Sequence, residues 1–318
     1  MGVFVYLPLV LPLTALPMAR LAEQHLHPRS ATRLLAVTGS TLALCSTLCL
    51  ALLMVVGTAQ LPGNPLPDGW SDPEVRAAVP FEEKAGLIAI GVLGAVLTAC
   101  GSTLLRHRRA RIRAAHALRP AADRETGGDL AVVPSPDPFA YALPGGRRHS
   151  GRVVVSTAMM ECLDARERRA LVAHERAHLT GRHHRYLLAT QLAARANPFL
   201  VPLRTSVAYS TERWADEEAA YAVGSRRDVA TAVGKAALFS HREPGPAVLP
   251  GFAEAAGPVP RRVAALLDPE PSAGLWPPAS AHLAVAAVTA TAGTAASALS
   301  SLNATVTLVG ILHAATPL

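Results

Sequence analysis

The chain has 318 residues, of which 50% are hydrophobic and only 17% are charged. Average soluble domains carry about 25% charged residues, and this chain's deficit is concentrated in a few long stretches. The composition argues against two soluble domains and indicates membrane spans. We interpret the net charge of +7 as arginines that flank membrane helices. We expect no nucleic-acid binding, because no aromatic side chains are interleaved with the basic residues.

Two uncharged stretches near the N-terminus predict the first membrane helices. Residues 2–19 carry no charged side chain, and we expect a span there that is bent by Pro8, Pro12 and Pro17. Residues 34–56 form a second uncharged stretch, long enough to cross roughly 30 Å of hydrocarbon.

A third span and the orientation of the chain follow from the charges around residues 85–105. The preceding segment, residues 59–84, is acidic and rich in proline, and the following segment, residues 106–113, has five arginines in eight residues. The short loop at residues 20–33 also has an excess of arginine. The positive-inside rule therefore places this loop and the region after residue 105 in the cytoplasm.

The C-terminal residues 281–318 contain no Asp, Glu, Lys or Arg. Gly293, Ser297 and Ser301 have the four-residue spacing of small residues at closely packed membrane helices. We interpret residues 283–314 as containing a fourth span, and the alternative is a disordered alanine-rich tail.

The region between the third and fourth spans has ordinary polarity. The short runs at 130–133, 139–143 and 152–156 are partly β-branched and bounded by Pro and Gly, and they predict strands or a hairpin. Residues 187–203 are apolar but short for a span, so a helix in the core or facing the membrane is expected. Residues 241–280 are rich in proline, with a short helix expected near 261–267.

Two histidines with metal-ligand spacing follow a helix start signal. Asp164 and Glu167 form an Asp-x-x-Glu capping pattern, and residues 166–179 contain good helix formers without Pro or Gly. His174 and His178 therefore lie one turn apart on one helix face, where two imidazoles can reach the same ion.

Acidic residues complete the predicted site. Glu175, beside the first histidine, is placed to take a proton from a water molecule next to the metal. A catalytic zinc ion needs three protein ligands and an open position. A predicted helix at residues 211–223 offers Glu212 as the third ligand, and Asp216 lies one turn further on the same face. Asp216 could hydrogen-bond the distal nitrogen of a liganding histidine and fix its ring.

Two other interpretations of the motif remain open. His184 could be the third ligand, because residues 174–184 also fit the metzincin pattern HExxHxxGxxH. Metzincins need a downstream methionine turn, however, and no methionine follows the motif in this chain. Alternatively, His174 and His178 could lie on a solvated surface, although their apolar neighbours Leu171 and Val172 indicate a half-buried helix. For His183 and His184 themselves, we favour polar residues near the membrane surface over a role as zinc ligand.

The run from Ala173 to His184, then Asn197-Pro198, then Glu212-Arg-Trp-Ala-Asp216 resembles the BlaR/MecR-type membrane metallopeptidases. These are integral-membrane gluzincins, and the HtpX/Ste24-type peptidases are similar. The resemblance implies one Zn²⁺ per chain bound by His174, His178 and Glu212, with Glu175 as general base and acid and Asp216 behind the ligands. The sensor members continue into a large extracellular domain, which we do not expect here.

The resulting prediction is a mainly α protein with about four membrane helices and a cytoplasmic α+β gluzincin-like domain. It would be a zinc endopeptidase of the cell membrane, in contact with the lipid bilayer, that cleaves a protein or peptide substrate. The alternative is a non-catalytic membrane signalling or scaffold protein with the same fold. The expected regions are two transmembrane helices in 1–58, an extracytoplasmic loop at 59–84, a third helix at 85–105, the peptidase domain at 106–280, and a fourth helix with a short tail at 281–318.

Overall fold

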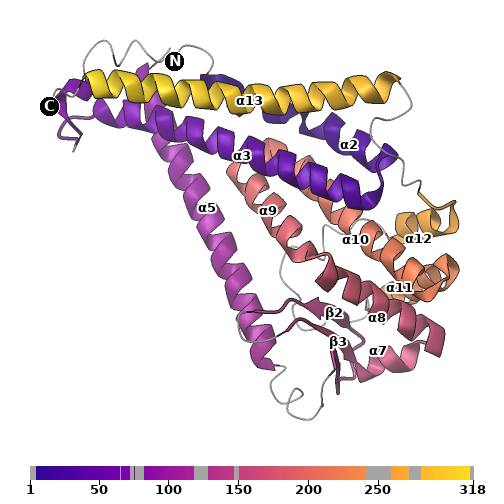
Figure 1. Ribbon diagram of the computed structural model, residues 1–318. Coiled ribbons are helices and arrows are strands. Elements are labelled where there is room, and N and C mark those ends of the chain that lie inside the picture. The colour runs from indigo at the N-terminus through magenta and orange to yellow at the C-terminus, as the bar shows by residue number, and fades with distance from the viewer. Residues whose placement is uncertain are drawn as a thin grey trace.

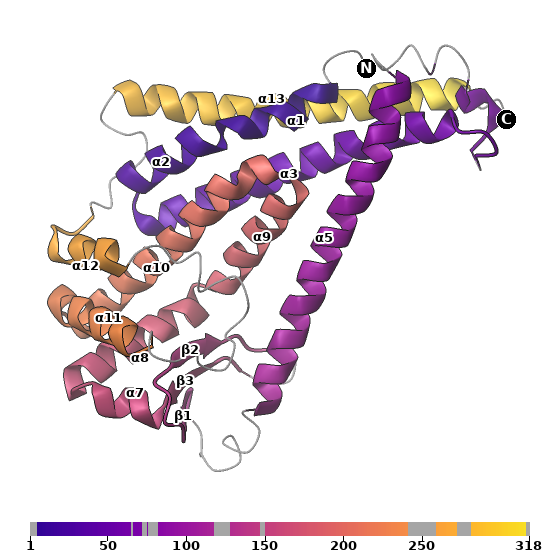
Figure 2. The same cartoon turned by 180° about the vertical axis from the view of Figure 1, so that it is seen from behind.

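The structure is a computed structural model that describes residues 5–64, 66–71, 75, 82–117, 128–146, 150–240, 259–271 and 281–315. Three long helices, α3 (Pro28–Ala59), α5 (Glu82–Ala117) and α13 (Ala281–Ala314), form its frame. Helix α13 runs alongside α3, whereas α5 diverges from one end of α3 (Figures 1 and 2). The short N-terminal helices of residues 7–25 lie along α3 and α13, whereas the small sheet and the helices of residues 157–240 lie on the side of α3 where α5 diverges (Figures 1 and 2).

The three long helices are also the candidate membrane spans among the described residues. The stretches Pro28–Ala59, Lys84–His116 and Ala290–Ala314 are long and apolar enough to cross a bilayer. They coincide with the second, third and fourth predicted spans. The predicted fold class, a mainly helical protein with membrane helices and a small α+β region, is therefore confirmed.

The first predicted span differs from the structure. Instead of one helix, the segment forms three short pieces: α1 (Leu7–Val10), the 3₁₀ turn η2 (Leu11–Thr14) and α2 (Ala15–His25). None is long enough to be a candidate span. Pro8 and Pro12 each stand at the start of one piece, where a residue without an N–H interrupts the hydrogen bonds of the preceding turn. Residues 1–4 lie outside the described residues.

A hydrogen bond from α3 provides a partner for one backbone carbonyl group of this interrupted segment. The Ser46 hydroxyl, in the middle of α3, donates to the carbonyl oxygen of Pro8 at 2.7 Å. The side chain of Asn197 donates to the same hydroxyl at 3.1 Å. Backbone groups released by proline inside a membrane protein need such partners, because lipid offers none. Ser46 thus links α1, α3 and the segment around Asn197.

Helices α3 and α5 cross in direct backbone contact at two glycines. A Cβ atom placed on Gly57 would lie 2.5 Å from the backbone of Gly86, and one placed on Gly86 would lie 2.4 Å from that of Gly57. Small residues at such a crossing allow membrane helices to approach closely. The crossing sets the angle at which α5 diverges from α3 toward the sheet (Figure 1).

We expect Gly57→Ala to destabilise the protein by about 1–3 kcal/mol, because the added methyl group must push the two backbones apart. The melting temperature of the full chain in neutral detergent would measure the effect. Gly94→Ala is the matched control, since nothing lies within 4 Å of a Cβ at that position of α5. Equal melting temperatures for both variants would contradict the close crossing.

The small sheet has the strand order β1-β3-β2. Strand β1 (Leu130–Val133) runs parallel to β3 (Arg152–Ser156), and β2 (Ala140–Leu143) runs antiparallel to it. These are the three predicted strands, and the β-branched residues at 153–155 are fully buried, as their composition indicates. Among the described residues, β2 pairs with β3 alone, so its other edge has no strand partner.

Among the described residues, the region after the sheet contains the helical elements α7 (Thr157–Cys162), α8 (Ala165–Thr180), α9 (His183–Ala196), η4 (Pro198–Leu200), α10 (Val201–Val223), α11 (Arg226–Ser240) and α12 (Val259–Leu267). Helix α10 begins well before the predicted start at residue 211. Its proline, Pro202, stands in the first turn, where a missing N–H costs no helical hydrogen bond. The rest of 241–280 lies mostly outside the described residues.

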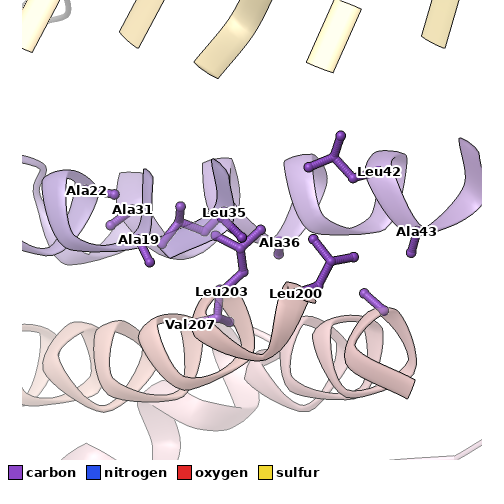
Figure 3. Packing of buried hydrophobic residues seen from close by; sticks show 12 residues of the cluster. Ala19, Ala22, Ala31, Leu35, Ala36, Leu42, Ala43, Leu200, Leu203 and Val207 are labelled. Carbon is purple, nitrogen blue, oxygen red and sulfur yellow. The ribbon is translucent and has the colours of Figure 1, made fainter. Parts of the chain in front are cut away.

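Helices α9 and α10 share a hydrophobic core with the membrane helix α3. Leu200, Leu203 and Val207 are buried in one cluster with Leu35 and Ala36, which lie on the side of α3 that faces them (Figure 3). Alanines of α2, α3 and α9 complete this cluster and keep the helices close together. The predicted apolar segment 187–203 therefore belongs to the core that joins α9 and α10 to α3.

Candidate metal centre

Helix α8 begins at the predicted cap and positions both histidines. The Asp164 carboxylate accepts hydrogen bonds from the backbone N–H groups of Arg166 and Glu167, at 2.8 and 3.0 Å. In return, the Glu167 carboxylate accepts from the N–H of Asp164 at 2.9 Å. This reciprocal capping box fixes the start of the helix. His174 and His178 then follow one turn apart.

The two imidazoles and one carboxylate of α10 converge on a single point. Nε2 of His174 lies 3.1 Å from Nε2 of His178, and each of these nitrogens lies 3.5 Å from an oxygen of Glu212. Ligands at zinc bond lengths in tetrahedral geometry are about 3.3 Å apart. The spacing of the three groups therefore fits one zinc ion, and among the described residues they form a possible metal-binding group.

A buried carboxylate and an arginine lie behind this group. Oδ1 of Asp216 lies 3.1 Å from Nδ1 of His174, a close contact that is off hydrogen-bond geometry. Arg262 of α12 donates to both Asp216 oxygens, at 2.6 and 2.9 Å, and its third nitrogen lies 2.9 Å from Glu212. Arg262 was not among the site residues predicted from the sequence. The sequence marked Arg262 only as a basic residue within the short helix expected near 261–267.

His183 occupies the other side of the group. Its Nδ1 lies 2.9 Å from Nδ1 of His178, and its ring packs on Trp214 with centroids 4.4 Å apart. The chain folds back tightly to place it, since a Cβ on Gly181 would lie 2.2 Å from the His183 ring and Arg182 has a φ of 52°. The expectation of a polar residue near the membrane surface is wrong for His183, which is buried.

The sequence of this region matches a known peptidase family. The family model of peptidase family M48 matches residues 106–270. The chain belongs to this family. M48 proteins are membrane zinc metallopeptidases of the HtpX/Ste24/BlaR type, so the resemblance seen in the sequence is confirmed. Comparisons with curated proteins and with solved structures give no match. His184, the alternative third ligand, is not among the converging groups of this M48 protein.

The charges around the converging groups suit a cation. Burial opposes ionisation of Glu212, but Arg262 and the two histidines hold the pKa of its carboxyl well below the usual range. Burial lowers the pKa of His178 to about 4, so that this ring is neutral and offers a lone pair. Burial also opposes protonation of His174, but Asp216 and Glu212 raise its pKa to about 10. A bound cation would compete with that proton.

Glu175 of the M48 protein lies next to the converging groups, and it lines a cavity together with them. The cavity has a volume of about 180 Å³ and is lined by His174, Glu175, Glu212, Arg262 and small or apolar side chains of α7, α8, α11 and β2. Burial raises the pKa of Glu175 to about 7, and the nearby backbone of Ala142 in β2 opposes part of this rise. A group with this pKa can both accept and return a proton near neutral pH.

Proposed function

We propose that this protein is a zinc endopeptidase embedded in a membrane. His174, His178 and Glu212 would hold the ion, Glu175 would act as general base and acid, and Asp216 would orient His174. The spacing of the two Nε2 atoms and the Glu212 oxygens carries the proposal, because it fits tetrahedral zinc without rearrangement. A non-catalytic scaffold would need neither this spacing nor a carboxylate beside it.

Zinc in such a site polarises the peptide carbonyl and lowers the pKa of water. The Glu175 carboxylate would accept a proton from the attacking water and pass it to the leaving amine nitrogen. Arg262 holds Glu212 and Asp216 in place and balances two of the buried negative charges. The open side of the cavity next to Glu175 leaves room for the scissile bond.

His183 would fix the tautomer of His178. If Nε2 of His178 binds the ion, its Nδ1 carries the proton and donates to Nδ1 of His183 at 2.9 Å. The His183 proton then sits on its own Nε2. Contact with Trp214 on one side and the close approach of Gly181 on the other hold the His183 ring. Partners of this kind raise metal affinity by orienting the ligand.

The substrate would bind as an extended strand along β2. The unpaired edge of β2 can supply main-chain hydrogen bonds to a peptide, and the contact between Ala142 and Glu175 places this edge beside the general base. Met159, Leu171 and Val233 line the cavity and favour an apolar side chain next to the cleaved bond. We place the site in the cytoplasm, as the arginines around residues 20–33 and 106–113 indicate.

The metal content of the purified full chain tests this function. We expect one zinc per chain by elemental analysis, and cleavage of an unfolded protein such as casein. A strong chelator should remove both, and added Zn²⁺ should restore both. The variant His178→Ala should contain substoichiometric zinc, whereas His184→Ala should keep one zinc per chain. Equal zinc in the two variants would contradict the proposed ligand set.

A further inference from the structure

A second cavity, of about 670 Å³, lies on the opposite face of α8 from the metal centre. It shares no lining residue with the cavity of Glu175. Its walls are α3, α8, α9 and α10. Five of its lining residues are arginines, namely Arg29, Arg33, Arg176, Arg182 and Arg185. We call it the arginine cavity.

Two of these guanidinium groups are held by a buried indole ring. Arg29 and Arg33 of α3 lie over Trp214, at 5.5 and 5.3 Å from the ring centroid. The Trp214 Nε1–H donates to Glu218 at 3.0 Å, and Glu218 is the one carboxylate among the lining residues. The cation–π contacts position the two side chains without neutralising them.

The positive charge of the arginine cavity is poorly balanced. Arg176 is neutralised by two hydrogen bonds to Asp129, at 2.6 and 2.7 Å. Within the described ranges, Arg29, Arg33, Arg182 and Arg185 have no carboxylate at ion-pair distance. Arg29 also stands in the first turn of α3, which has no acidic residue and where the helix dipole is positive. A bound anion would balance this positive charge.

The position of the arginine cavity identifies the kind of anion. Arg29 and Arg33 begin a candidate membrane span, so the cavity lies where the hydrocarbon region ends. Val37 and Leu44 are on the same face of α3, at helical spacing from Arg33, and are 64% and 71% exposed. A phosphoryl group among the arginines would therefore continue into acyl chains along this apolar face.

We propose that the arginine cavity binds the phosphate headgroup of an anionic phospholipid. Guanidinium groups suit this ligand, because each can donate two parallel hydrogen bonds to phosphate oxygens. The cavity volume is ample for a phosphoglycerol headgroup. Its acyl chains would cover α3 from Val37 toward Leu44.

Lipid binding to the full chain in neutral detergent tests the proposal. Short-chain phosphatidylglycerol, phosphatidylcholine, inorganic phosphate and an acidic peptide would each be titrated, and the rise in melting temperature would give an apparent Kd. Only phosphatidylglycerol should stabilise the wild type strongly. A matching effect of inorganic phosphate would show that the acyl chains do not contribute, and a matching effect of the peptide would show that the ligand is not a lipid. Either would overturn the proposal.

Paired variants separate the site from general charge attraction. An arginine near an anionic lipid surface contributes about a fivefold factor in affinity, so Arg29→Gln with Arg33→Gln should weaken binding about 25-fold. Arg182→Gln with Arg185→Gln, on the other wall of the cavity, should weaken lipid binding by a similar factor. Arg108→Gln with Arg109→Gln, two exposed arginines of α5, removes equal charge and should change binding less than about twofold.

The unliganded melting temperature checks that each variant folds. Each wall is tested by its own pair, so a folding defect in one pair leaves the other to decide. Equal losses of affinity in the α5 control and in both cavity pairs would show nonspecific attraction and overturn the assigned site. Unchanged lipid affinity in both cavity pairs would also overturn the assigned site.

Discussion

Replacing Glu175 with glutamine is expected to slow peptide cleavage by about 10²- to 10⁴-fold while the chain retains one zinc ion. The amide keeps the shape of the side chain but cannot accept the proton that the proposed mechanism assigns to it. His174, His178 and Glu212 are untouched, so the ion should remain. Initial cleavage rates, normalised to zinc content, would measure the effect.

Glu161→Gln provides the matched control, because Glu161 is an exposed glutamate of the neighbouring helix α7. This variant should cleave at the wild-type rate. If Glu175→Gln retained both zinc and the native rate, Glu175 would not be the base. If it lost zinc instead, the carboxylate would have a structural part in the metal site that the geometry does not indicate.

Replacing Arg262 with methionine is expected to destabilise the metal-free protein by about 3–5 kcal/mol. Arg262 donates to both oxygens of Asp216, which is fully buried, and approaches Glu212 at 2.9 Å. Methionine fills similar space but leaves these two carboxylates without their cation. The loss would appear as a lower melting temperature of the chelator-treated chain in detergent.

The preceding residue supplies the control for Arg262. Arg261 is about half exposed, pairs with Glu23 at 2.8 Å and lies over the ring of Tyr209. Arg261→Met should therefore cost only about 1 kcal/mol. Zinc should recover part of the stability of Arg262→Met, since the ion restores positive charge beside Glu212. Similar melting temperatures for the two variants would contradict the proposed role of the buried ion pair.

Local patterns predict much of this fold and of the converging site. The capping pair Asp164 and Glu167, the spacing of His174 and His178, and the β-branched strand segments are all short-range signals, and each is found where the sequence places it. Three of the predicted spans coincide with long apolar helices, because length and composition alone determine such a signal. The four-residue spacing of Glu212 and Asp216 on one helix is also a short-range signal.

The features that were missed depend on contacts distant in sequence or on backbone geometry. Arg262 and Arg261 are adjacent and chemically identical, and only the packing of α12 on α10 buries one of them. His183 turns inward because the backbone takes a left-handed conformation at Arg182, a residue type that does not signal it. The prolines of the first span were expected to bend it, but its division into three short pieces depends on the partners available to the freed backbone.

The shared core of α3 and α10 has a consequence for how the protein can be handled. Leu203 and Val207 pack on the membrane helix, and Glu212 and Asp216 lie further along the same α10. An excised fragment spanning 106–270 would expose that apolar stripe to water and lose the support that sets the pitch and rotation of α10. The region of the candidate metal centre therefore depends on α3 for its support, and solubilisation must preserve the packing between α3 and α10 to preserve the arrangement of the metal-binding groups.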